Sequence, residues 1–491
     1  MRHAPLAMTP DEFRSLGHRL VDRIAEHLRT LPERPVTHGE PPSDVRDALG
    51  ASRRIPDKGE DGAAALLDSA DLLFDHSTFN GHPRFLAYIT SSPAPLGMLG
   101  DFLAAAVNQN MGAWKLAPMA TEIEAQTVRW IAELIEFPVN CGGLLVSGGN
   151  MANFVCFLAA RAAKAGWDVR KNGFQTDSCR LAVYTSAETH TWIQKAADLF
   201  GLGTDAIRWL PVDAEQRMVP SALCRAIDED RLRGVRPFMV VGTAGSVATG
   251  AVDPLPELAE ICRAHEIWFH VDGAYGGLAA QVPGVPDSLR GLSEADSVAV
   301  DPHKWLYAPL EAGCALVRDA THLRSAFSYH PAYYHFDHDV LNYFDYGPQN
   351  SRGFRALKVW LGLRQAGRAG YVQMIADDIA LAARLHERMQ HHPAFEAISR
   401  SLSIATFRYV PEDLRAERGS SAVETYLNNL NQDLLTRVEK SGEAFLSNAV
   451  VGGRFALRAC IVNFHTSAED IDALPELLLR LGRESDAALR K

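Results

Sequence analysis

The residues from 142 to 318 alternate between short apolar runs typical of strands and longer runs with helical composition. Seven runs have the length and residue types of buried strands: 143–147, 181–185, 207–211, 238–242, 267–271, 297–300 and 313–317. Because helices that connect strands in this rhythm cover both faces of a sheet, the pattern predicts an α/β fold with a mostly parallel, seven-stranded sheet. The last strand follows a connection too short for a crossover helix, so we expect it to run antiparallel to residues 297–300.

The chain before this region predicts a helical arm. Thr9 and Glu12 have the spacing of a capping box, with Pro10 at the first helical position. Apolar residues then recur at helical spacing: Phe13, Leu16, Leu20, Ile24 and Leu28. Sequence rich in proline and glycine follows from 32 to 61, which places the arm, residues 1–85, outside the main domain. Such an arm packs either on its own chain or on a second subunit, and we favour a dimer.

The chain after the sheet region predicts a second, smaller domain. A long helical stretch over 354–390 leads to a mixed segment that ends in a strand candidate over 455–464 and a final helix. We therefore expect a large domain over 86–365 and a small α+β domain over 366–491. The length of 491 residues and the hydrophobic content of 47% are sufficient for this many parts.

Charge and cysteine content restrict the class of protein. The formal net charge is −11 and the isoelectric point is about 5.9, so the chain has no global basic field for nucleic acid or an anionic membrane. The first residues contain no apolar signal core, and no stretch has the length of a membrane span. The 7 scattered cysteines form no C-x-x-C pair, which favours reduced thiols. We expect a cytoplasmic protein that binds neither nucleic acid nor membranes.

Two histidine clusters have the wrong spacing or setting for a metal site. His265 and His270 are one residue too far apart for the H-E-x-x-H pattern, and they stand in a strand-like run where they cannot share a helical face. His335 and His338 lie in an expected loop. We therefore expect no bound metal.

Ligands of open α/β sheets bind beyond the carboxyl ends of strands, and four features of this chain stand at such ends. Gly148, Gly149 and Asn150 follow the first strand and precede a helix, where free N–H groups at a positive helix terminus suit a phosphate. His190 follows the second strand, where its flat ring can stack on a flat ligand; a structural histidine is the alternative. Asp272 follows the fifth strand, and a buried carboxylate there needs a cationic partner, which a ligand can supply.

The fourth feature is Lys304, in the run Asp301-Pro302-His303-Lys304-Trp305 beyond the sixth strand. An amine partly desolvated beside Trp305 loses some preference for its charged form, and neutral lysine condenses with an aldehyde. A solvated surface lysine is the alternative for any lysine taken alone. Together the four features match pyridoxal phosphate, which needs an amine for its aldehyde, an anion for its pyridinium nitrogen, donors for its phosphate and a surface for its ring.

Five motifs carry a resemblance along nearly the whole chain: H-P-R-F-L-A-Y from His82, A-P-M-A-T-E-I-E from Ala117, H-V-D-G-A-Y-G-G from His270, D-P-H-K-W from Asp301 and S-R-G-F-R-A-L-K-V-W from Ser351. In these motifs the sequence resembles the pyridoxal-phosphate-dependent group II amino-acid decarboxylases. That family includes the aromatic-L-amino-acid, histidine, tyrosine and glutamate decarboxylases. The resemblance implies the fold type I architecture of pyridoxal phosphate enzymes and a homodimer with active sites at the subunit interface.

The resemblance also implies roles for the motif residues. Lys304 would bind the cofactor aldehyde and later move protons, and Asp272 would pair with the pyridinium nitrogen. His190 would stack over the ring, with Ala274 against its other face. Phosphate contacts would come from Gly148, Gly149, Asn150, His303 and Ser351, the last reaching across to the neighbouring subunit.

One position departs from the family pattern. Val247 stands where many relatives have a hydroxyl, in the run Gly245-Ser246-Val247. Ser246 or Thr243 remains as a substitute, and the sequence does not choose between them.

The resemblance favours loss of carbon dioxide followed by reprotonation at the substrate Cα. By its distance from Lys304, Tyr333 stands where the family has a proton-donating tyrosine on a loop. Relatives that convert amino acids to aldehydes with oxygen replace this tyrosine or the stacking histidine, and Tyr333 and His190 are both present here. We therefore expect an amine product. An oxidative aldehyde synthase and a non-catalytic binding protein of the same fold are the alternatives.

The expected substrate is an aromatic L-amino acid: tryptophan, phenylalanine, tyrosine or dopa. An acidic substrate would need a second cation, and the candidates Arg84 and Arg458 are better explained as structural. The substrate side chain would be lined by Tyr88 and Ser91 of one subunit and by Asn110, Gly112 and Trp114 of the other. Gly112 stands where aromatic relatives often carry a bulky residue, and the additional room would suit indole.

Overall fold

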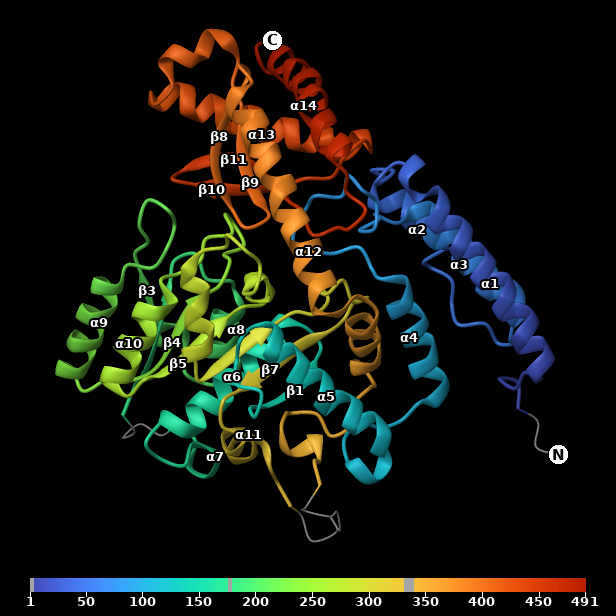
Figure 1. The fold of residues 1–491 in the computed structure, drawn as a ribbon. Helices are drawn as coiled ribbons and strands as arrows, with labels where there is room; N and C mark the ends of the chain where they lie inside the picture. Colours follow the sequence, from blue (N-terminus) through green and yellow to red (C-terminus); the bar gives the residue numbers. More distant parts are fainter. Residues whose placement is uncertain (1–3, 175–178, 331–339) are drawn as a thin grey trace.

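The computed structural model describes residues 4–174, 179–330 and 340–491. Figure 1 shows a large body built around one sheet, a smaller C-terminal unit beside it, and the N-terminal helices along one side. A long helix labelled α12 (Ala356–His391) runs from the large body into the C-terminal unit.

The large body is organised by a seven-stranded sheet. Its strands are β1 (Gly142–Val146), β2 (Leu181–Ser186), β3 (Ile207–Leu210), β4 (Arg236–Thr243), β5 (Trp268–Asp272), β6 (Ser297–Val300) and β7 (Gly313–Val317). They lie in the order β1-β7-β6-β5-β4-β2-β3; β3, β2, β4, β5 and β6 are parallel, and β7 is antiparallel to both β6 and β1. The predicted mostly parallel sheet and its antiparallel last strand are confirmed.

Helices cover both faces of this sheet. They are α5 (Pro118–Leu134), α6 (Gly149–Lys164), α7 (Val169–Asn172), α8 (Trp192–Leu199), α9 (Pro220–Leu232), α10 (Leu255–His265) and α11 (Ala320–Phe327). Neighbouring residues of β1 point to opposite faces. Leu144 belongs to the apolar cluster that includes Val155 of α6, whereas Leu145 belongs to the one that includes Ile131 of α5 and Ile227 of α9. Burial on both faces explains why the strands read as continuous apolar runs.

The C-terminal unit is an α+β layer, as predicted. Its strands and helices are β8 (Phe395–Ser401), β9 (Ile404–Tyr409), α13 (Ser421–Ser441), β10 (Ser447–Val451), β11 (Arg454–Cys460) and α14 (Ala468–Leu489). The strands lie in the order β10-β11-β9-β8 and all pair antiparallel. Its core joins Leu427 and Leu434 of α13 to Phe407 of β9.

Two expected element boundaries are wrong. The helical stretch over 354–390 is interrupted at Gly367, whose φ of +63° lies outside the helical range and falls just beyond the predicted junction of the two domains. The strand expected over 455–464 ends at Cys460, because the chain then turns through Asn463, whose side chain donates to the carbonyl oxygen of His82 at 2.9 Å. The domain boundaries themselves remain a prediction.

The N-terminal segment forms the predicted helical arm. Its helices are α1 (Pro10–Thr30), α2 (Pro42–Leu49) and α3 (Gly62–His76), followed by α4 (Pro95–Val107) beside the large body. The capping box is confirmed, because Thr9 Oγ1 accepts from Glu12 N at 3.2 Å and Glu12 Oε2 accepts from Thr9 N at 2.8 Å. Arg23 of α1 donates to the carbonyl oxygen of Leu67 in α3 at 2.9 Å. No described helix combines the length and the hydropathy of a transmembrane span.

Short 3-10 helices complete the fold. They are Leu31–Glu33, Trp114–Leu116, Thr204–Ala206, Gly276–Ala279, Asp287–Glu294, Tyr343–Asp345 and Glu412–Glu417. They form parts of the connections between the longer elements.

Candidate active site

A cavity of about 400 Å³ opens at the carboxyl ends of the parallel strands. Its walls come from the segments that follow β1, β2, β4, β5 and β6, where ligands of open α/β sheets bind. Nine residues that the sequence predicted for cofactor binding line it: Gly148, Gly149, Asn150, His190, Thr243, Asp272, Ala274, His303 and Lys304. Residues from five strand ends therefore meet in one cavity.

The turn after β1 leaves a space that a side chain would fill. Gly148 has a φ of +104°, which favours glycine, and a Cβ there would lie 3.3 Å from His303 Cε1. Gly149 opens α6, and a Cβ there would lie 2.7 Å from Asp301 Oδ2. The first turn of α6 has N–H groups without helical partners and a positive dipole end, so this space suits an anion.

Asp272 ends β5 with 7% of its surface exposed. Its Oδ2 accepts a hydrogen bond from Trp192 Nε1 at 2.7 Å, and its Oδ1 accepts from Ala274 N at 3.2 Å. Within the described residues, neither of these partners is a cation, and Asp272 takes part in no ion pair. The carboxylate is therefore oriented by neutral donors and remains available to a cationic ligand.

Two histidines of this region differ in burial, because His270 is fully buried whereas His190 is exposed. His270 lies between Asn153 Oδ1 at 2.7 Å and Ser297 Oγ at 2.8 Å, and burial lowers its pKa to about 4. These two hydrogen bonds satisfy both ring nitrogens, which explains how His270 can be buried inside a strand. His190 lines the cavity, where partial desolvation lowers its pKa, and its Nδ1 accepts from Trp192 N at 3.3 Å. A neutral, flat ring at the cavity wall suits stacking on a flat ligand.

Lys304 has a carboxylate as its neighbour. Its Nζ lies 3.1 Å from Asp301 Oδ2, and 18% of the lysine side chain is exposed. The low exposure agrees with the expected partial desolvation, whereas the carboxylate beside the amine was not expected. Trp305 itself is fully buried, stacks on Tyr275 at 4.5 Å and donates to Asp378 Oδ2 at 3.0 Å. Asp301 was not among the predicted site residues, although its place three residues before Lys304 in the same motif was an available signal.

The structure distinguishes the two candidate hydroxyls near Val247. Val247, at the position where many relatives are expected to have a hydroxyl, lines the cavity. Ser246 Oγ is paired with Thr249 Oγ1 at 3.0 Å. Thr243 lines the cavity, and its Oγ1 is buried without a hydrogen-bond partner among the residues that the structure describes. Of the two hydroxyls, that of Thr243 is therefore the one without a partner in the described chain, and its role towards a ligand remains a proposal.

The residues predicted for the substrate side chain do not line the cavity of their own chain. Tyr88 is 60% exposed. Ser91 is buried, and its hydroxyl donates to the carbonyl oxygen of His303 at 2.7 Å, so it supports the loop before Lys304. Of this segment, Ile89 is the residue that reaches the cavity.

Asn110, Gly112, Trp114 and Ser351 also lie outside this cavity. Asn110 Nδ2 donates to Ser351 Oγ at 3.4 Å, and Gly112 N donates to Asn110 Oδ1 at 3.0 Å. A Cβ at position 112 would lie 2.1 Å from the carbonyl oxygen of Asn350. The close backbone approach of Asn350 explains the glycine, so the argument that Gly112 makes room for a large substrate is wrong. That these residues contribute to the active site of a neighbouring subunit remains a proposal.

The two arginines considered for an acidic substrate have structural partners. Arg84 Nε pairs with Asp470 Oδ1 at 3.1 Å, and Arg458 Nη1 donates to Ser447 Oγ at 2.9 Å. Neither arginine lines the cavity. Three residues considered in the sequence lie outside the described residues: Tyr333, His335 and His338.

Comparison with known proteins decides the family. A family model described as the pyridoxal-dependent decarboxylase conserved domain matches residues 42–410. The chain belongs to this family. An aromatic-L-amino-acid decarboxylase of Bacillus atrophaeus is 33% identical over 472 residues, 95% of this chain and 94% of that protein. A phenylacetaldehyde synthase of Petunia hybrida is 32% identical, covering 92% of this chain and 91% of that protein. The crystal structure of Oryza sativa TDC with PLP and tryptamine matches with a TM-score of 0.89 and 28% identity, covering 98% of this chain and 99% of that chain.

The cofactor of this pyridoxal-dependent decarboxylase family is pyridoxal phosphate, and the fold is fold type I. The residues present fit that group. The cavity offers an amine on Lys304, a buried carboxylate on Asp272 and a hydroxyl on Thr243 without a protein partner. The glycine turn after β1 leaves space at a positive helix end. With the His190 ring at the cavity wall as a surface for stacking, the cavity offers the four kinds of contact that the cofactor needs.

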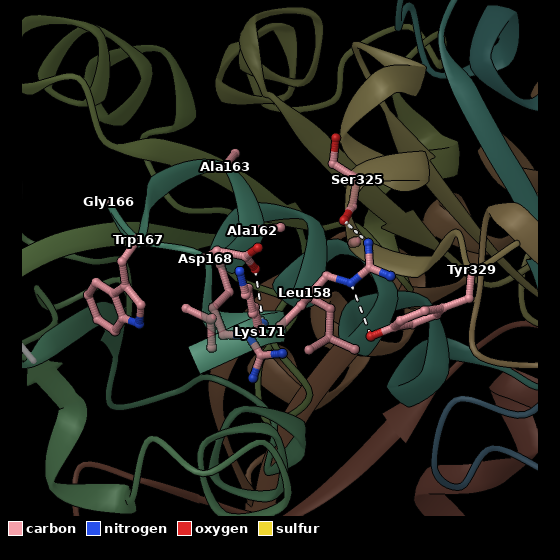
Figure 2. A pocket seen from close by; sticks show the side chains of 13 residues that line it. Leu158, Ala162, Ala163, Gly166, Trp167, Asp168, Lys171, Ser325 and Tyr329 are labelled. Carbon is pink, nitrogen blue, oxygen red and sulfur yellow. Dashed lines mark hydrogen bonds between the residues drawn. The ribbon is translucent and has the colours of Figure 1, made fainter. Parts of the chain in front are cut away.

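A larger cavity, of about 890 Å³, lies apart from this site, between α6, α7 and α11. Figure 2 shows Ser325 and Tyr329 on the opposite side of this cavity from Trp167. Arg170 donates to the carbonyl oxygens of Ser325 at 2.5 Å and Ser328 at 2.6 Å, and its guanidinium lies 4.0 Å from the Tyr329 ring centre. Because the protein itself satisfies this cation, the larger cavity lacks the chemistry of the smaller one.

Proposed function

We propose that this decarboxylase converts an aromatic L-amino acid into the corresponding amine and carbon dioxide. The observation that carries the proposal is the convergence of Lys304, Asp272 and His190 on one cavity at the strand ends. The aromatic substrate is supported by the Bacillus atrophaeus relative and by the Oryza sativa structure, which contains tryptamine.

Each residue around the ring has a separate task. When bound, the cofactor supplies an electron-accepting ring to the bond that breaks at the substrate Cα. Lys304 anchors the cofactor and then moves protons at Nζ. Asp272, oriented by the Trp192 N–H, holds a proton on the ring nitrogen. His190 stacks on one face of the ring, and Ala274 packs against the other.

The phosphate would be held at the glycine turn after β1, next to the loop that carries His303 and Lys304. Gly148 and Gly149 give it room, and Asn150 and His303 stand beside it. Thr243 stands beside Asp272 in the register of β4 and β5, so its unpartnered hydroxyl would lie near the ring of the cofactor. Ser351 completes the phosphate site of a neighbouring subunit.

Covalent trapping tests the cofactor roles. The protein is purified with pyridoxal phosphate, reduced with borohydride and digested for peptide mass mapping. A mark on Lys304 that disappears in Lys304→Ala is expected. A wild-type protein without any mark would favour a non-catalytic member of the fold.

Substrate preference is tested with a panel of amino acids. We expect kcat/KM for the best of tryptophan, phenylalanine, tyrosine and dopa to exceed that for glutamate and histidine by roughly 100-fold, the scale of discrimination by one pocket. Equal or higher efficiency with glutamate would contradict the aromatic assignment.

The phenylacetaldehyde synthase relative favours a second candidate, oxidative conversion to an aldehyde. Tyr333 and His190, which aldehyde-forming relatives are expected to replace, are both present here. Tyr333→Phe removes the proposed proton donor, so we expect its product to shift from amine towards aldehyde with oxygen uptake. The product is measured by chromatography and the oxygen by electrode. An amine-only product from Tyr333→Phe would remove Tyr333 from the mechanism.

A homodimer with active sites at the interface is part of the proposal. An apolar face of α4 supports it, since Leu99, Phe102, Leu103 and Val107 are each 51–55% exposed. A cytoplasmic location is also proposed and is supported by seven free cysteines. The proposed partners are the amino-acid substrate and a second copy of the chain, without nucleic acid or membrane.

A further inference from the structure

Asp301 lines the same cavity but has no place in the roles above. Its side chain is 3% exposed, and its Oδ2 lies 3.1 Å from Lys304 Nζ. Its Oδ1 is buried and has no hydrogen-bond partner within the described chain. Protein interiors rarely leave a carboxylate oxygen buried and unpaired, because the lost hydration is not replaced. The position therefore needs an explanation beyond packing.

Several titratable or charged groups surround this carboxylate. They are His190, Asp272, His303, Lys304 and Glu311. Burial lowers the pKa of His303, whose Nε2 stays 3.7 Å from Asp301 Oδ2. Glu311 is paired with Arg355 at 2.7 Å. Within the described cavity, the ammonium of Lys304 is the nearest proton source for Asp301.

The carboxylate also stands at the turn proposed for the phosphate. A Cβ on Gly149 would lie 2.7 Å from Asp301 Oδ2, so the start of α6 and the carboxylate are in close approach. A phosphate at this turn brings negative charge next to an ionised Asp301, and like charges in a buried site repel strongly. A proton on Asp301 removes that repulsion.

We propose that Asp301 accepts the proton that Lys304 must lose before its amine can bind an aldehyde. The proposal rests on the anchoring of the cofactor by Lys304. One of the three hydrogens on Nζ moves to Asp301 Oδ2, and the freed lone pair forms the bond to the aldehyde carbon. The aldehyde oxygen leaves as water with the other two nitrogen hydrogens. The transferred proton stays on Asp301, which is then neutral beside the phosphate.

The rate of covalent capture tests this step without any substrate. Cofactor-free protein is mixed with pyridoxal phosphate at several neutral to mildly alkaline pH values, and the Lys304 adduct is trapped with borohydride over time. The wild-type rate is expected to change little with pH. Asp301→Asn is expected to slow capture by about tenfold or more near neutrality, the lower range for a general base. Its rate then rises about tenfold per pH unit, because hydroxide must remove the proton instead.

Binding of an analogue separates proton transfer from folding. 4-Deoxypyridoxine 5′-phosphate carries the ring and the phosphate but no aldehyde. Asp301→Asn is expected to bind it at least as tightly as the wild type, since one negative charge beside the phosphate is gone. Asp230→Asn is the matched control. It also removes a buried carboxylate from an ion pair, with Arg208 at 2.8 Å, and is expected to capture the cofactor at the wild-type rate.

Three outcomes would overturn the proposal. The first is that Asp301→Asn captures the cofactor at the wild-type rate. The second is that Asp301→Asn loses analogue affinity and capture rate in parallel, which is the result of a purely structural role. The third is a wild-type capture rate that rises about tenfold per pH unit. This outcome needs no variant, so it tests the proposal even if Asp301→Asn does not fold. Absence of any wild-type capture would instead contradict the anchoring role of Lys304 and, with it, the proposed function.

Discussion

At the scale of single residues, the site depends on side chains that hold other side chains. Trp192 donates through its indole to Asp272 Oδ2 at 2.7 Å and through its backbone N–H to His190 Nδ1 at 3.3 Å. One residue thus orients both the carboxylate and the ring that are proposed to contact the cofactor. Such supporting contacts restrict side-chain rotation and keep the site in one geometry.

Thr243 provides a test at this scale. Its hydroxyl is buried without a partner among the described residues, so Thr243→Val removes no protein hydrogen bond and is expected to leave thermal stability nearly unchanged. Affinity for pyridoxal phosphate is expected to fall about 5–10-fold, the value of one hydrogen bond of about 1 kcal/mol. Both quantities are measured by thermal unfolding and cofactor titration.

Ser246→Ala is the matched control for Thr243→Val. It removes the hydroxyl that is paired with Thr249, so its effect is expected on stability and not on cofactor affinity. The reverse pattern, with affinity lost in Ser246→Ala and kept in Thr243→Val, would contradict the assignment of the ligand-facing hydroxyl.

At the scale of elements, α12 supports the loop that carries Lys304. Asp378 of α12 accepts hydrogen bonds from Trp305 Nε1 at 3.0 Å and from Tyr307 Oη at 2.7 Å. Burial raises the pKa of Asp378 to about 7. The helix that joins the two units of the molecule therefore also fixes the segment next to the anchoring lysine.

The raised pKa of Asp378 predicts a pH-dependent stability. An unfolded aspartate releases its proton near pH 4, whereas Asp378 in the folded chain keeps it to about 7. The folded state therefore binds the additional proton in this window, and stability falls as pH rises through it. Asp378→Asn cannot ionise but keeps an oxygen acceptor. Between about pH 4 and 7 the variant is expected to lose less of its free energy of unfolding than the wild type. The difference between the two losses is on the order of 2–4 kcal/mol.

Denaturant unfolding across this pH range measures the difference. Parallel stability profiles of Asp378→Asn and the wild type would show that Asp378 does not hold a proton in the folded state.

The sequence predicted the elements of the large body better than their arrangement. Seven strands were predictable because burial on both faces leaves continuous apolar runs. The pairing of β1 with β7 was not, since partners far apart in the chain leave no local signal. The sequence did not predict β8 and β9 either, because β8 is only partly buried and its residues show no continuous apolar run.

The candidate site shows the same division. Lys304 and Asp272 were predictable because each stands at a strand end in one of the five motifs, and His190 because it follows the second strand. The contacts of Asp301 with Lys304 and of Trp192 with Asp272 depend on side-chain directions, which local sequence does not determine. The space at Gly112 was misjudged because the approaching Asn350 carbonyl is remote in sequence.

At the scale of the whole molecule, the N-terminal segment links the separate parts. Leu86 N donates to the carbonyl oxygen of Phe445 at 2.8 Å, and Cys460 N donates to the carbonyl oxygen of Leu86 at 2.8 Å. The chain therefore passes along the C-terminal unit before it enters the large body. Phe13 of α1 stacks with Phe102 of α4 at 6.2 Å, and both rings stay about half exposed, at 54% and 52%. We propose that a second copy of the chain buries this surface in a dimer interface.

The variant Phe102→Asp tests this proposed dimer interface. A charge in the proposed interface is expected to shift the chain from dimer to monomer in light scattering and to lower activity in parallel. Leu232→Asp is the control, because Leu232 is 88% exposed at the end of α9, away from α4. A dimer that survives Phe102→Asp unchanged would exclude this face as the interface.

The proposed reaction of the whole molecule is the non-oxidative decarboxylation of an aromatic amino acid with the cofactor anchored on Lys304. The most direct test follows carbon dioxide, product and oxygen together in one reaction of the purified holoenzyme with the best aromatic substrate. We expect equal amounts of carbon dioxide and amine, no oxygen uptake, and no turnover by Lys304→Ala. Aldehyde formed with stoichiometric oxygen uptake would contradict it.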